Sequence, residues 1–223
     1  MKRFVACISL ISVVLLTTVA LPSPVEARFP GGGTSEFYYG KGFWQYEMNY
    51  AHGIRGGNYV YQQNPGSGLL FSQFVAAPGW EWDWGCWTPS GWYTAGYYQL
   101  STSSPRFIVT WKHGAYSYEC WDVWEYAPLE THRDYEIYNN WGTWYIYIDG
   151  VQRKTDTYYG GGGSFCCMVS KRVPSGQCYG WFEDLQYCTY STDWDDWYSL
   201  GLADTVYVGT YRVNDHCFGT YAN

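Results

Sequence analysis

The chain has 223 residues, of which 22% are aromatic and only 15% are charged. This composition excludes a disordered, highly charged or coiled-coil protein. The formal net charge of -7 argues against a nucleic-acid partner, because such a partner requires a basic surface that displaces its counterions. The abundance of Tyr, Trp and Gly favours pleated strands and tight turns over helices, so we expect an all-β fold.

The N-terminal segment has the features of an export signal. Lys2 and Arg3 precede an apolar run over residues 4–21, and the small residue Ala27 ends the segment. We therefore predict that residues 1–27 are a signal peptide and that the mature protein is secreted, without membrane attachment after cleavage. An uncleaved anchor helix is the alternative, because the apolar run approaches the length that spans a bilayer.

The cysteines fit an exported protein. Seven follow the predicted cleavage point: Cys86, Cys120, Cys166, Cys167, Cys178, Cys188 and Cys217. We expect disulfides among them, with the odd thiol left free or shared in a disulfide-linked oligomer. A zinc cluster is disfavoured, because no short C-x-x-C spacing is present and the compartment is oxidising. We therefore predict neither a metal nor another cofactor.

The rest of the chain is predicted to form one domain. Residues 28–36, which are rich in glycine, are expected to be a flexible leader, and no long linker divides residues 37–223. Aromatic and acidic residues alternate over residues 80–84, and a second alternating run starts at Thr205 and continues to Val213. A period of two places successive side chains on opposite faces of a strand, so we expect a strand in each run.

A hairpin is predicted from the segment 144–148 and the Asp149-Gly150 pair that follows it. Asp-Gly tolerates the positive φ angles of a two-residue turn, so the chain is expected to fold back there. No segment keeps a helical period for long. The expected architecture is an antiparallel two-sheet β-sandwich of the jelly-roll type.

Two residues in aromatic segments are candidates for chemistry. Glu183 directly follows Trp181 and Phe182, and partial burial at that position would raise the pKa of its carboxyl group and suit it to acid-base catalysis. Gln99 ends the segment 94–99 and offers a neutral amide. If both strands lie centrally in one sheet, the two side chains converge in a concave cleft. Otherwise Gln99 satisfies a nearby backbone group and Glu183 pairs with a basic residue.

These segments resemble motifs of the glutamic peptidases, the eqolisin group and its neprosin-like relatives. Residues 181–185 are similar to the string that carries the family's catalytic Glu, and residues 94–99 are similar to the run that ends on its Gln. Between them, residues 122–130 resemble a family segment of the form Asp-x-Trp-x-Glu-x-x-Pro-Glu. The resemblance implies a concanavalin A-like sandwich.

The resemblance also implies a secreted endopeptidase that hydrolyses a polypeptide substrate at acidic pH. Glu183 would act as general base toward water and then as acid toward the leaving amine, while the Gln99 amide donates to the developing oxyanion. Trp84, Trp87 and Trp181 are the residues expected to line the substrate cleft.

A non-catalytic binding module is the alternative, with an extracellular polysaccharide as partner, because exposed aromatic rings stack on the faces of sugars. The candidate platform comprises Trp80, Trp82, Trp87, Trp92, Trp194 and Trp197. The two functions differ in geometry. A peptidase requires Gln99 and Glu183 to face one cleft, whereas a sugar-binding module requires several coplanar exposed rings.

The sequence also bears on two further functions. A secreted structural or self-assembling protein is favoured by the Tyr and Gly content and by the odd cysteine. A glycosidase is disfavoured, because such enzymes use a pair of carboxylates and no Glu follows Glu183 in the chain.

Overall fold

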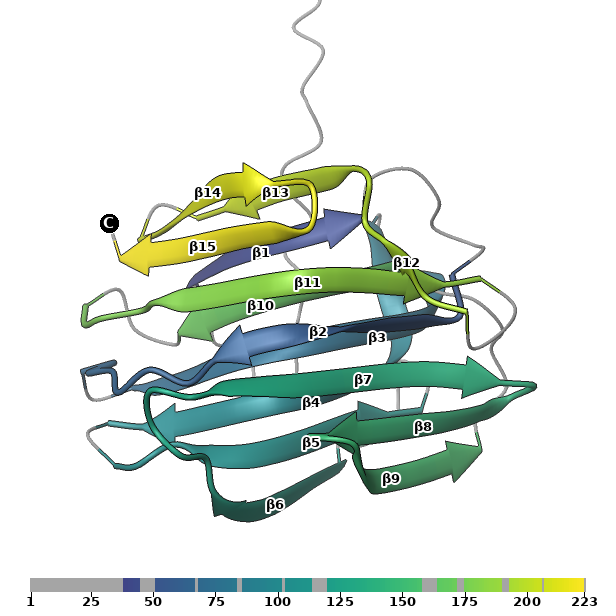
Figure 1. Ribbon diagram of the computed structural model, residues 1–223, viewed down its shortest axis with the longest axis horizontal. Helices are drawn as coiled ribbons and strands as arrows, with labels where there is room; N and C mark the ends of the chain where they lie inside the picture. The colour runs from purple at the N-terminus through teal and green to yellow at the C-terminus, as the bar shows by residue number, and fades with distance from the viewer. Residues whose placement is uncertain are drawn as a thin grey trace, which may run out of the picture.

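The computed structural model shows two antiparallel sheets packed face to face, with one sheet in front of the other in the view of Figure 1. The structure describes residues 38–44, 51–66, 68–83, 86–101, 103–113, 120–157, 164–171, 175–189, 193–205 and 207–222. The predicted signal peptide and leader lie outside these ranges. None of the described residues forms a helix long and apolar enough to cross a membrane.

Sheet A has seven strands in the order β13-β1-β10-β3-β4-β5-β6. These are β1 (Tyr38–Trp44), β3 (Leu69–Asp83), β4 (Cys86–Leu100), β5 (Arg106–Lys112), β6 (Cys120–Tyr126), β10 (Ser164–Lys171) and β13 (Leu200–Asp204). Its strands form the rear layer in Figure 1.

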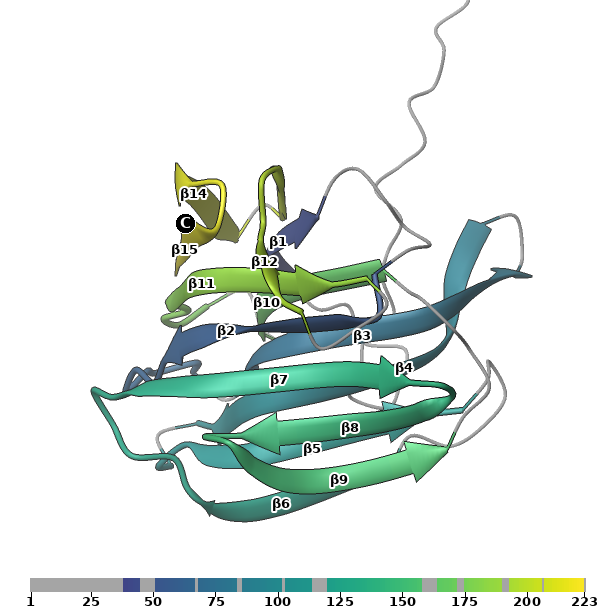
Figure 2. The same ribbon diagram turned by 45° about the vertical axis from the view of Figure 1, so that its right-hand side comes forward.

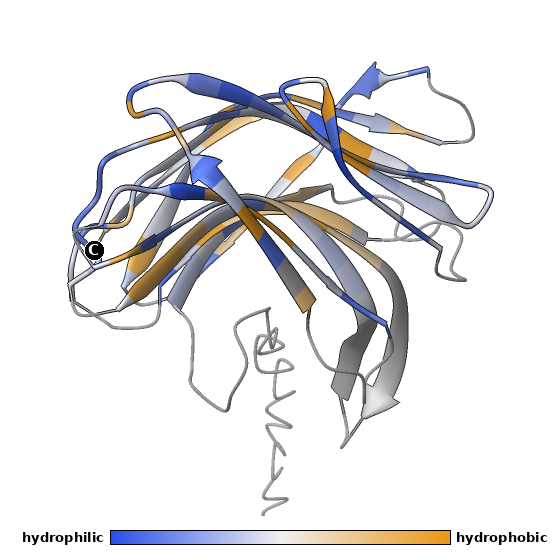
Figure 3. Ribbon diagram, turned by 90° about the horizontal axis from the view of Figure 1, so that it is seen from below, coloured by the Kyte–Doolittle hydropathy of each residue, from blue (hydrophilic) through white to orange (hydrophobic). Residues whose placement is uncertain are grey.

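Sheet B has the strand order β14-β15-β11-β2-β7-β8-β9, and the short β12 pairs with β11. These are β2 (Gly53–Tyr59), β7 (His132–Asn140), β8 (Thr143–Ile148), β9 (Val151–Thr157), β11 (Gly180–Cys188), β12 (Asp195–Asp196), β14 (Val208–Asn214) and β15 (Cys217–Ala222). Figure 2 separates this front layer from sheet A, and Figure 3 shows the two layers curving together. The predicted all-β two-sheet sandwich is therefore confirmed.

The predicted hairpin is present. β8 and β9 pair antiparallel and are joined by Asp149 and Gly150, which have φ angles of 53° and 71°. Two successive positive φ angles give a turn whose twist matches that of the flanking strands. The preceding connection is equally tight, because Trp141 and Gly142 also have positive φ angles, and β7 therefore continues as far as Asn140.

The alternating run from Thr205 to Val213 forms a strand only from Val208 onward, whereas the prediction started the strand at Thr205. β13 ends at Asp204 in sheet A, and β14 begins at Val208 in sheet B. The amide of Val208 donates to the carbonyl of Thr205, which closes a tight turn between them. The chain changes sheets at this turn, and a period of two along the chain does not reveal to which sheet a strand belongs.

The core between the sheets is built from aromatic pairs. Tyr93 of β4 stacks on Trp144 of β8 with ring centroids 4.8 Å apart, and Phe74 of β3 stacks on Tyr135 of β7 at 5.5 Å. All four side chains are almost completely buried. Such pairs contribute about 0.5–1.5 kcal/mol each beyond the burial of their area. The aromatic content of the sequence is thus partly explained as cross-sheet packing.

The cysteines do not form the expected disulfides among the described residues. Free thiols are found at Cys120, Cys166, Cys167, Cys178, Cys188 and Cys217, whereas the side chain of Cys86 lies outside the description. Cys166 and Cys167 are neighbours in β10, so the pleat directs them to opposite faces of sheet A. Desolvation by burial raises the pKa of the Cys166 thiol to about 11 and that of the Cys167 thiol well above its ordinary value.

Candidate functional site

Gln99 lies in β4 of sheet A and its side chain is completely buried. Its amide oxygen accepts a 3.2 Å hydrogen bond from the backbone amide of Gln63, and its amide nitrogen donates to the Gln63 carbonyl at 2.6 Å. The same nitrogen donates to the carbonyl of Ser101 at 3.2 Å. Gln99 therefore fastens the segment after β2 to the end of β4, as in the alternative role considered for this residue.

Glu183 lies in β11 of sheet B, on the face that points away from sheet A; we call this face the outer face. The side chain is 30% exposed. One carboxylate oxygen lies 2.6 Å from Nδ1 of His132, and the other accepts a 2.6 Å hydrogen bond from the indole nitrogen of Trp181. The structure therefore gives Glu183 an imidazole and an indole as partners rather than Arg or Lys.

The structure does not bring Gln99 and Glu183 together. Their strands belong to different sheets, and Gln99 is closed off from solvent whereas Glu183 faces outward. The condition for one shared cleft is therefore not met. Trp181 does accompany Glu183, whereas Trp84 and the side chain of Trp87 lie outside the described residues.

A β-bulge in β11 determines which side chains reach the outer face. The register between β11 and β2 shifts between Glu183 and Gln186, and Asp184 has a φ of 50°, in the left-handed region. Strict alternation from Glu183 would direct Gln186 toward the core. Because of the extra residue, Leu185 is buried in the core and Gln186 reaches the outer face instead. Bulges that re-aim a side chain in this way are common beside functional sites.

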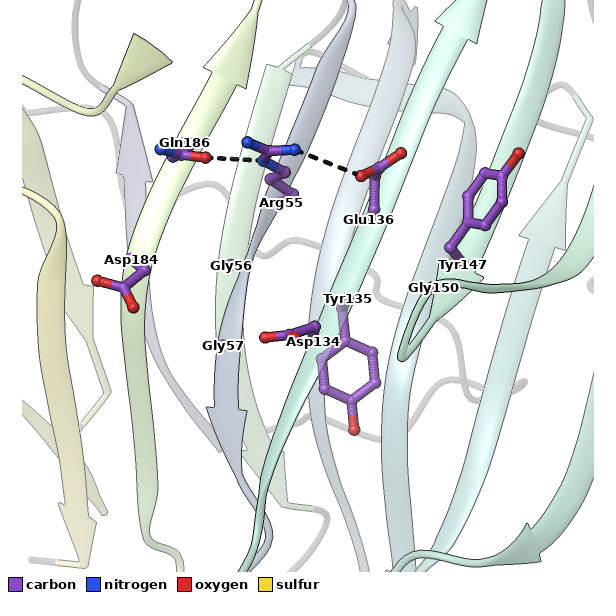
Figure 4. Close-up of a pocket in the computed structure, with 10 residues that line it drawn as sticks. All are labelled: Arg55, Gly56, Gly57, Asp134, Tyr135, Glu136, Tyr147, Gly150, Asp184 and Gln186. Atoms are coloured by element: carbon purple, nitrogen blue, oxygen red, sulfur yellow. Dashed lines mark hydrogen bonds and ion pairs between the residues drawn. The ribbon is translucent and has the colours of Figure 1, made fainter. Parts of the chain in front are cut away.

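A pocket of about 500 Å³ lies on this face, beside the bulge. Its lining residues are Arg55, Gly56, Gly57, Asp134, Tyr135, Glu136, Tyr147, Gly150, Asp184 and Gln186. They come from β2, β7, β8 and β11 and from the β8–β9 turn, as Figure 4 shows. Gly57 of β2, whose Cβ position faces outward beside Glu183, leaves the floor of the pocket without a side chain. A volume of this size suits a small molecule or one segment of a polymer.

Arg55 lies at one end of the pocket. Its side chain extends between Gln186 and Glu136 in Figure 4, with a 2.7 Å hydrogen bond to Gln186 and a 3.9 Å ion pair with Glu136. The guanidinium also lies 4.5 Å from the centre of the Trp194 ring. Desolvation by burial raises the pKa of the Glu136 carboxyl group, and the charge of Arg55 opposes that shift.

The other part of the pocket is acidic. Asp134 is the cross-strand neighbour of Gly57, which in turn is the neighbour of Glu183 in β11. The side chains of Asp134 and Asp184 are exposed and have no hydrogen-bond or ion-pair partner among the described residues. Gly57 also connects the pocket to Glu183, because a Cβ added at Gly57 would lie 3.3 Å from Cγ of Glu183.

Two tyrosine rings lie flat on the outer face of sheet B, in the edge strand β14 and its neighbour β15. A Cβ added at Gly219 of β15 would lie 2.3 Å from the ring of Tyr211, and one added at Gly209 of β14 would lie 2.4 Å from the ring of Tyr221. Each ring therefore covers a glycine of the neighbouring strand, and the two tyrosines remain 44% and 42% exposed. Trp181 lies 6.5 Å from Tyr211 between ring centroids.

Of the six tryptophans expected to form a sugar platform, the three whose side chains the structure describes are not exposed together as one. Trp92 and Trp197 are buried at 7% and 1% exposure, and Trp194 packs against Arg55. Trp80, Trp82 and Trp87 have side chains outside the described residues. The exposed rings of sheet B are tyrosines instead. Tyr211 and Tyr221 are tilted by 43° to each other, so they form a bent surface rather than coplanar rings.

A second polar feature lies in sheet A. Gln73 of β3 is completely buried, and neither polar atom of its amide has a hydrogen-bond partner. A buried polar group without a partner costs about 1–3 kcal/mol. Because Gln73 is closed off from solvent, we place the candidate site on the outer face of sheet B, where charged and aromatic side chains are exposed.

The described residues contain no group of three or more His, Cys, Asp or Glu side chains that would hold a metal ion. The sequence alone did not identify several residues of this face as binding candidates, namely Arg55, Asp134, Glu136 and Gln186. It also did not identify Tyr211 and Tyr221 as a pair. The sequence carries only a weak signal for the tyrosine pair. Tyr211 and Gly219 are close in the chain, but only the antiparallel register of β14 and β15 makes them neighbours.

The fold defines a two-sheet sandwich of the type found in glutamic peptidases. A Scytalido-glutamic peptidase with a peptide-based transition-state analogue matches with a TM-score of 0.60 and 8% identity, over 85% of this chain and 100% of that chain. SCP-B, a member of the eqolisin family in complex with the tripeptide Ala-Ile-His, matches with a TM-score of 0.59 and 8% identity, over 85% of this chain and 99% of that chain.

A weaker likeness is to a laminarinase catalytic domain from Thermotoga maritima, with a TM-score of 0.46 and 10% identity over 71% of this chain and 79% of that domain. No protein-family model and no curated protein sequence matches the chain. The chain therefore shares the fold of the eqolisin peptidases, as its sequence motifs implied.

Proposed function

We propose that the protein is a secreted glycan-binding protein that uses the outer face of sheet B. The observation that carries this proposal is the pair of tyrosine rings, Tyr211 and Tyr221, which lie flat over glycines with their other faces exposed. The C–H groups of a pyranose ring pack favourably on such a face. Export by the predicted signal peptide would bring this face to an extracellular polysaccharide.

The pocket on the same face of sheet B supplies the polar half of the site. Planar groups that donate or accept two hydrogen bonds suit the neighbouring hydroxyl groups of a sugar, and Arg55, Glu136 and Gln186 are groups of this kind. Their positions are fixed before a ligand arrives, because Arg55 contacts both of the others. Such preorganisation reduces the ordering cost of binding.

The test is binding of the mature protein to a panel of insoluble polysaccharides and soluble oligosaccharides, measured by pull-down and calorimetry. Replacing both Tyr211 and Tyr221 by Ala is expected to weaken binding at least tenfold. Tyr126→Ala is the matched control, because Tyr126 is 60% exposed but belongs to sheet A. The proposal is rejected if no glycan binds, or if the double variant and the control bind as tightly as the wild type.

A second candidate function is hydrolysis of peptide bonds with Glu183 as general base. It is favoured by the likeness to two peptidase structures over 85% of this chain. The amide that shares the outer face with Glu183 is Gln186 of the same strand, whereas Gln99 is bound to the backbone of Gln63. In this function Glu183 takes a proton from water and Gln186 donates to the oxyanion.

Proteolysis of a denatured polypeptide at acidic and neutral pH tests this second function. The mature protein is compared with Glu183→Gln and Gln186→Ala, and with Gln62→Ala as a control for an exposed amide. Loss of cleavage in the first two variants alone supports a peptidase. Equal cleavage in all four proteins, or none in any, excludes Glu183 as a catalytic residue.

A further inference from the structure

The outer face of sheet B carries an excess of negative charge that the proposed glycan function does not explain. The pocket contains the carboxylates of Asp134, Glu136 and Asp184 but the single guanidinium of Arg55. Arg55 is already engaged by Glu136 and Gln186. The remaining two carboxylates, those of Asp134 and Asp184, have no basic partner among the described residues, and Glu183 adds a further carboxylate beside Gly57.

Aromatic side chains lie close to the acidic residues of this face. The ring centroid of Tyr59 in β2 lies 4.6 Å from that of Tyr61 and 4.9 Å from that of His132. His132 is the residue that pairs with Glu183. Burial is the main reason why the pKa of the Tyr61 hydroxyl group is raised, and the Glu183 carboxylate adds to the shift. A carboxylate next to aromatic rings attracts a cation through its negative charge. The negative faces of the rings add a second attraction.

We propose that the ligand of this face is a glycan with free amino groups, whose ammonium groups lie between Asp134, Asp184 and Glu183 while its sugar rings pack on Tyr211 and Tyr221. This inference rests on the proposed glycan-binding function and names the class of glycan. The argument is charge complementarity: a neutral glycan would leave the two unpartnered carboxylates without a counter-charge, whereas an ammonium group supplies three donors to them.

The geometry requires an oligomer rather than a single sugar. Four strand intervals separate Tyr211 in β14 from Asp134 in β7, through β15, β11 and β2. With strands about 4.8 Å apart, the rings and the acidic pocket are separated by about 19 Å across the sheet. A chain of several sugars that runs perpendicular to the strands reaches both parts of the face.

The experiment compares three oligosaccharides of equal length: a β-1,4-linked glucosamine oligomer, its fully N-acetylated form and a neutral glucose oligomer. Dissociation constants are measured by calorimetry with the mature protein, at low and at high salt. We expect the glucosamine oligomer to bind at least tenfold more tightly than the other two, with a preference that shrinks at high salt because screening weakens the charge interaction.

Replacing Asp134 and Asp184 by Asn is expected to lower the affinity for the glucosamine oligomer to about that of the other two oligomers, which abolishes the preference. Asp122→Asn, an exposed carboxylate of β6 in sheet A, is the matched control and should keep the preference. Equal affinity for all three oligomers overturns the inference but leaves glycan binding intact. Failure of every oligomer and polysaccharide to bind overturns the proposed function itself. A preference that survives the double substitution also overturns the inference.

Discussion

Arg55 donates a 2.7 Å hydrogen bond to the side chain of Gln186, and the two residues are cross-strand neighbours in sheet B directly beyond the β11 bulge. Without the bulge, Gln186 would face the core and Arg55 would have only Glu136 as a polar partner. The extra residue in β11 therefore builds the polar end of the pocket, and Asp184, which carries the unusual backbone conformation, lines its acidic part.

The bulge is tested by changing Asp184. Its φ of 50° is in the left-handed region, which Asp tolerates and a β-branched residue does not. We expect Asp184→Val to lower the free energy of unfolding by about 1–3 kcal/mol, whereas Asp184→Gly stays near the wild type. Urea unfolding measures both. Equal stability of the two variants would show that residue 184 does not need a positive φ.

Gly219 is predicted to control the orientation of the Tyr211 ring. A Cβ at this position would lie 2.3 Å from the ring, so Gly219→Ala must displace the ring from the sheet. The clash is with the end of a flexible side chain, so we expect little loss of stability but at least a fivefold loss of glycan affinity. Calorimetry on the best-binding oligosaccharide checks this, with Gly142→Asn as the control, since Gly142 has open space around its Cβ position, a positive φ that Asn tolerates and no place in the pocket lining. Unchanged affinity of Gly219→Ala contradicts a flat ring as the binding surface.

The sequence predicts the two-sheet fold and the Asp149-Gly150 hairpin because these depend on local patterns, namely alternation and turn chemistry. It offers the structural role of Gln99 only as an alternative and does not identify the partner, because that partner is the backbone of Gln63, 36 residues earlier in the chain. Strict alternation from Glu183 would also direct Gln186 to the wrong face, because one inserted residue in β11 inverts the alternation that follows. Features of the site that depend on register or on long-range contacts are therefore found only in the structure.

Gln99 is predicted to be a structural residue. It is completely buried and makes three hydrogen bonds to backbone groups, so Gln99→Ala leaves a cavity and unpaired backbone groups. We expect the free energy of unfolding to fall by about 2–4 kcal/mol. Gln62→Ala serves as the control, because Gln62 is exposed and makes one long hydrogen bond of 3.3 Å. A Gln99→Ala protein as stable as the control would contradict this role.

Glu136 is predicted to make stability depend on pH. Burial raises the pKa of its carboxyl group in the folded protein, so the folded state binds the proton more readily than the unfolded state. The charged group therefore destabilises the fold at neutral pH, and this cost is relieved as the pH falls through the raised folded-state value. We expect the wild type to gain stability relative to Glu136→Gln between about pH 7 and about pH 5.

Unfolding by urea at several pH values measures this difference. The comparison with Glu136→Gln isolates the carboxyl group, because the amide keeps the shape of the side chain but does not titrate. A difference that stays constant over the range, or one that changes in the opposite direction, contradicts a raised pKa for Glu136.

The thiols are predicted to be free and mostly unreactive in the folded protein. Burial raises the pKa of both Cys178 and Cys188 to about 12, so at about pH 8 the thiolate fraction of each is on the order of 10⁻⁴. Cys120 is exposed and should be alkylated first. Mass spectrometry of protein alkylated without a reductant is expected to show one fast modification in the native state and, after denaturation, modification of all six described thiols. Cys120→Ser should remove the fast phase alone, and denatured protein that takes up fewer labels until it is reduced would instead reveal disulfides.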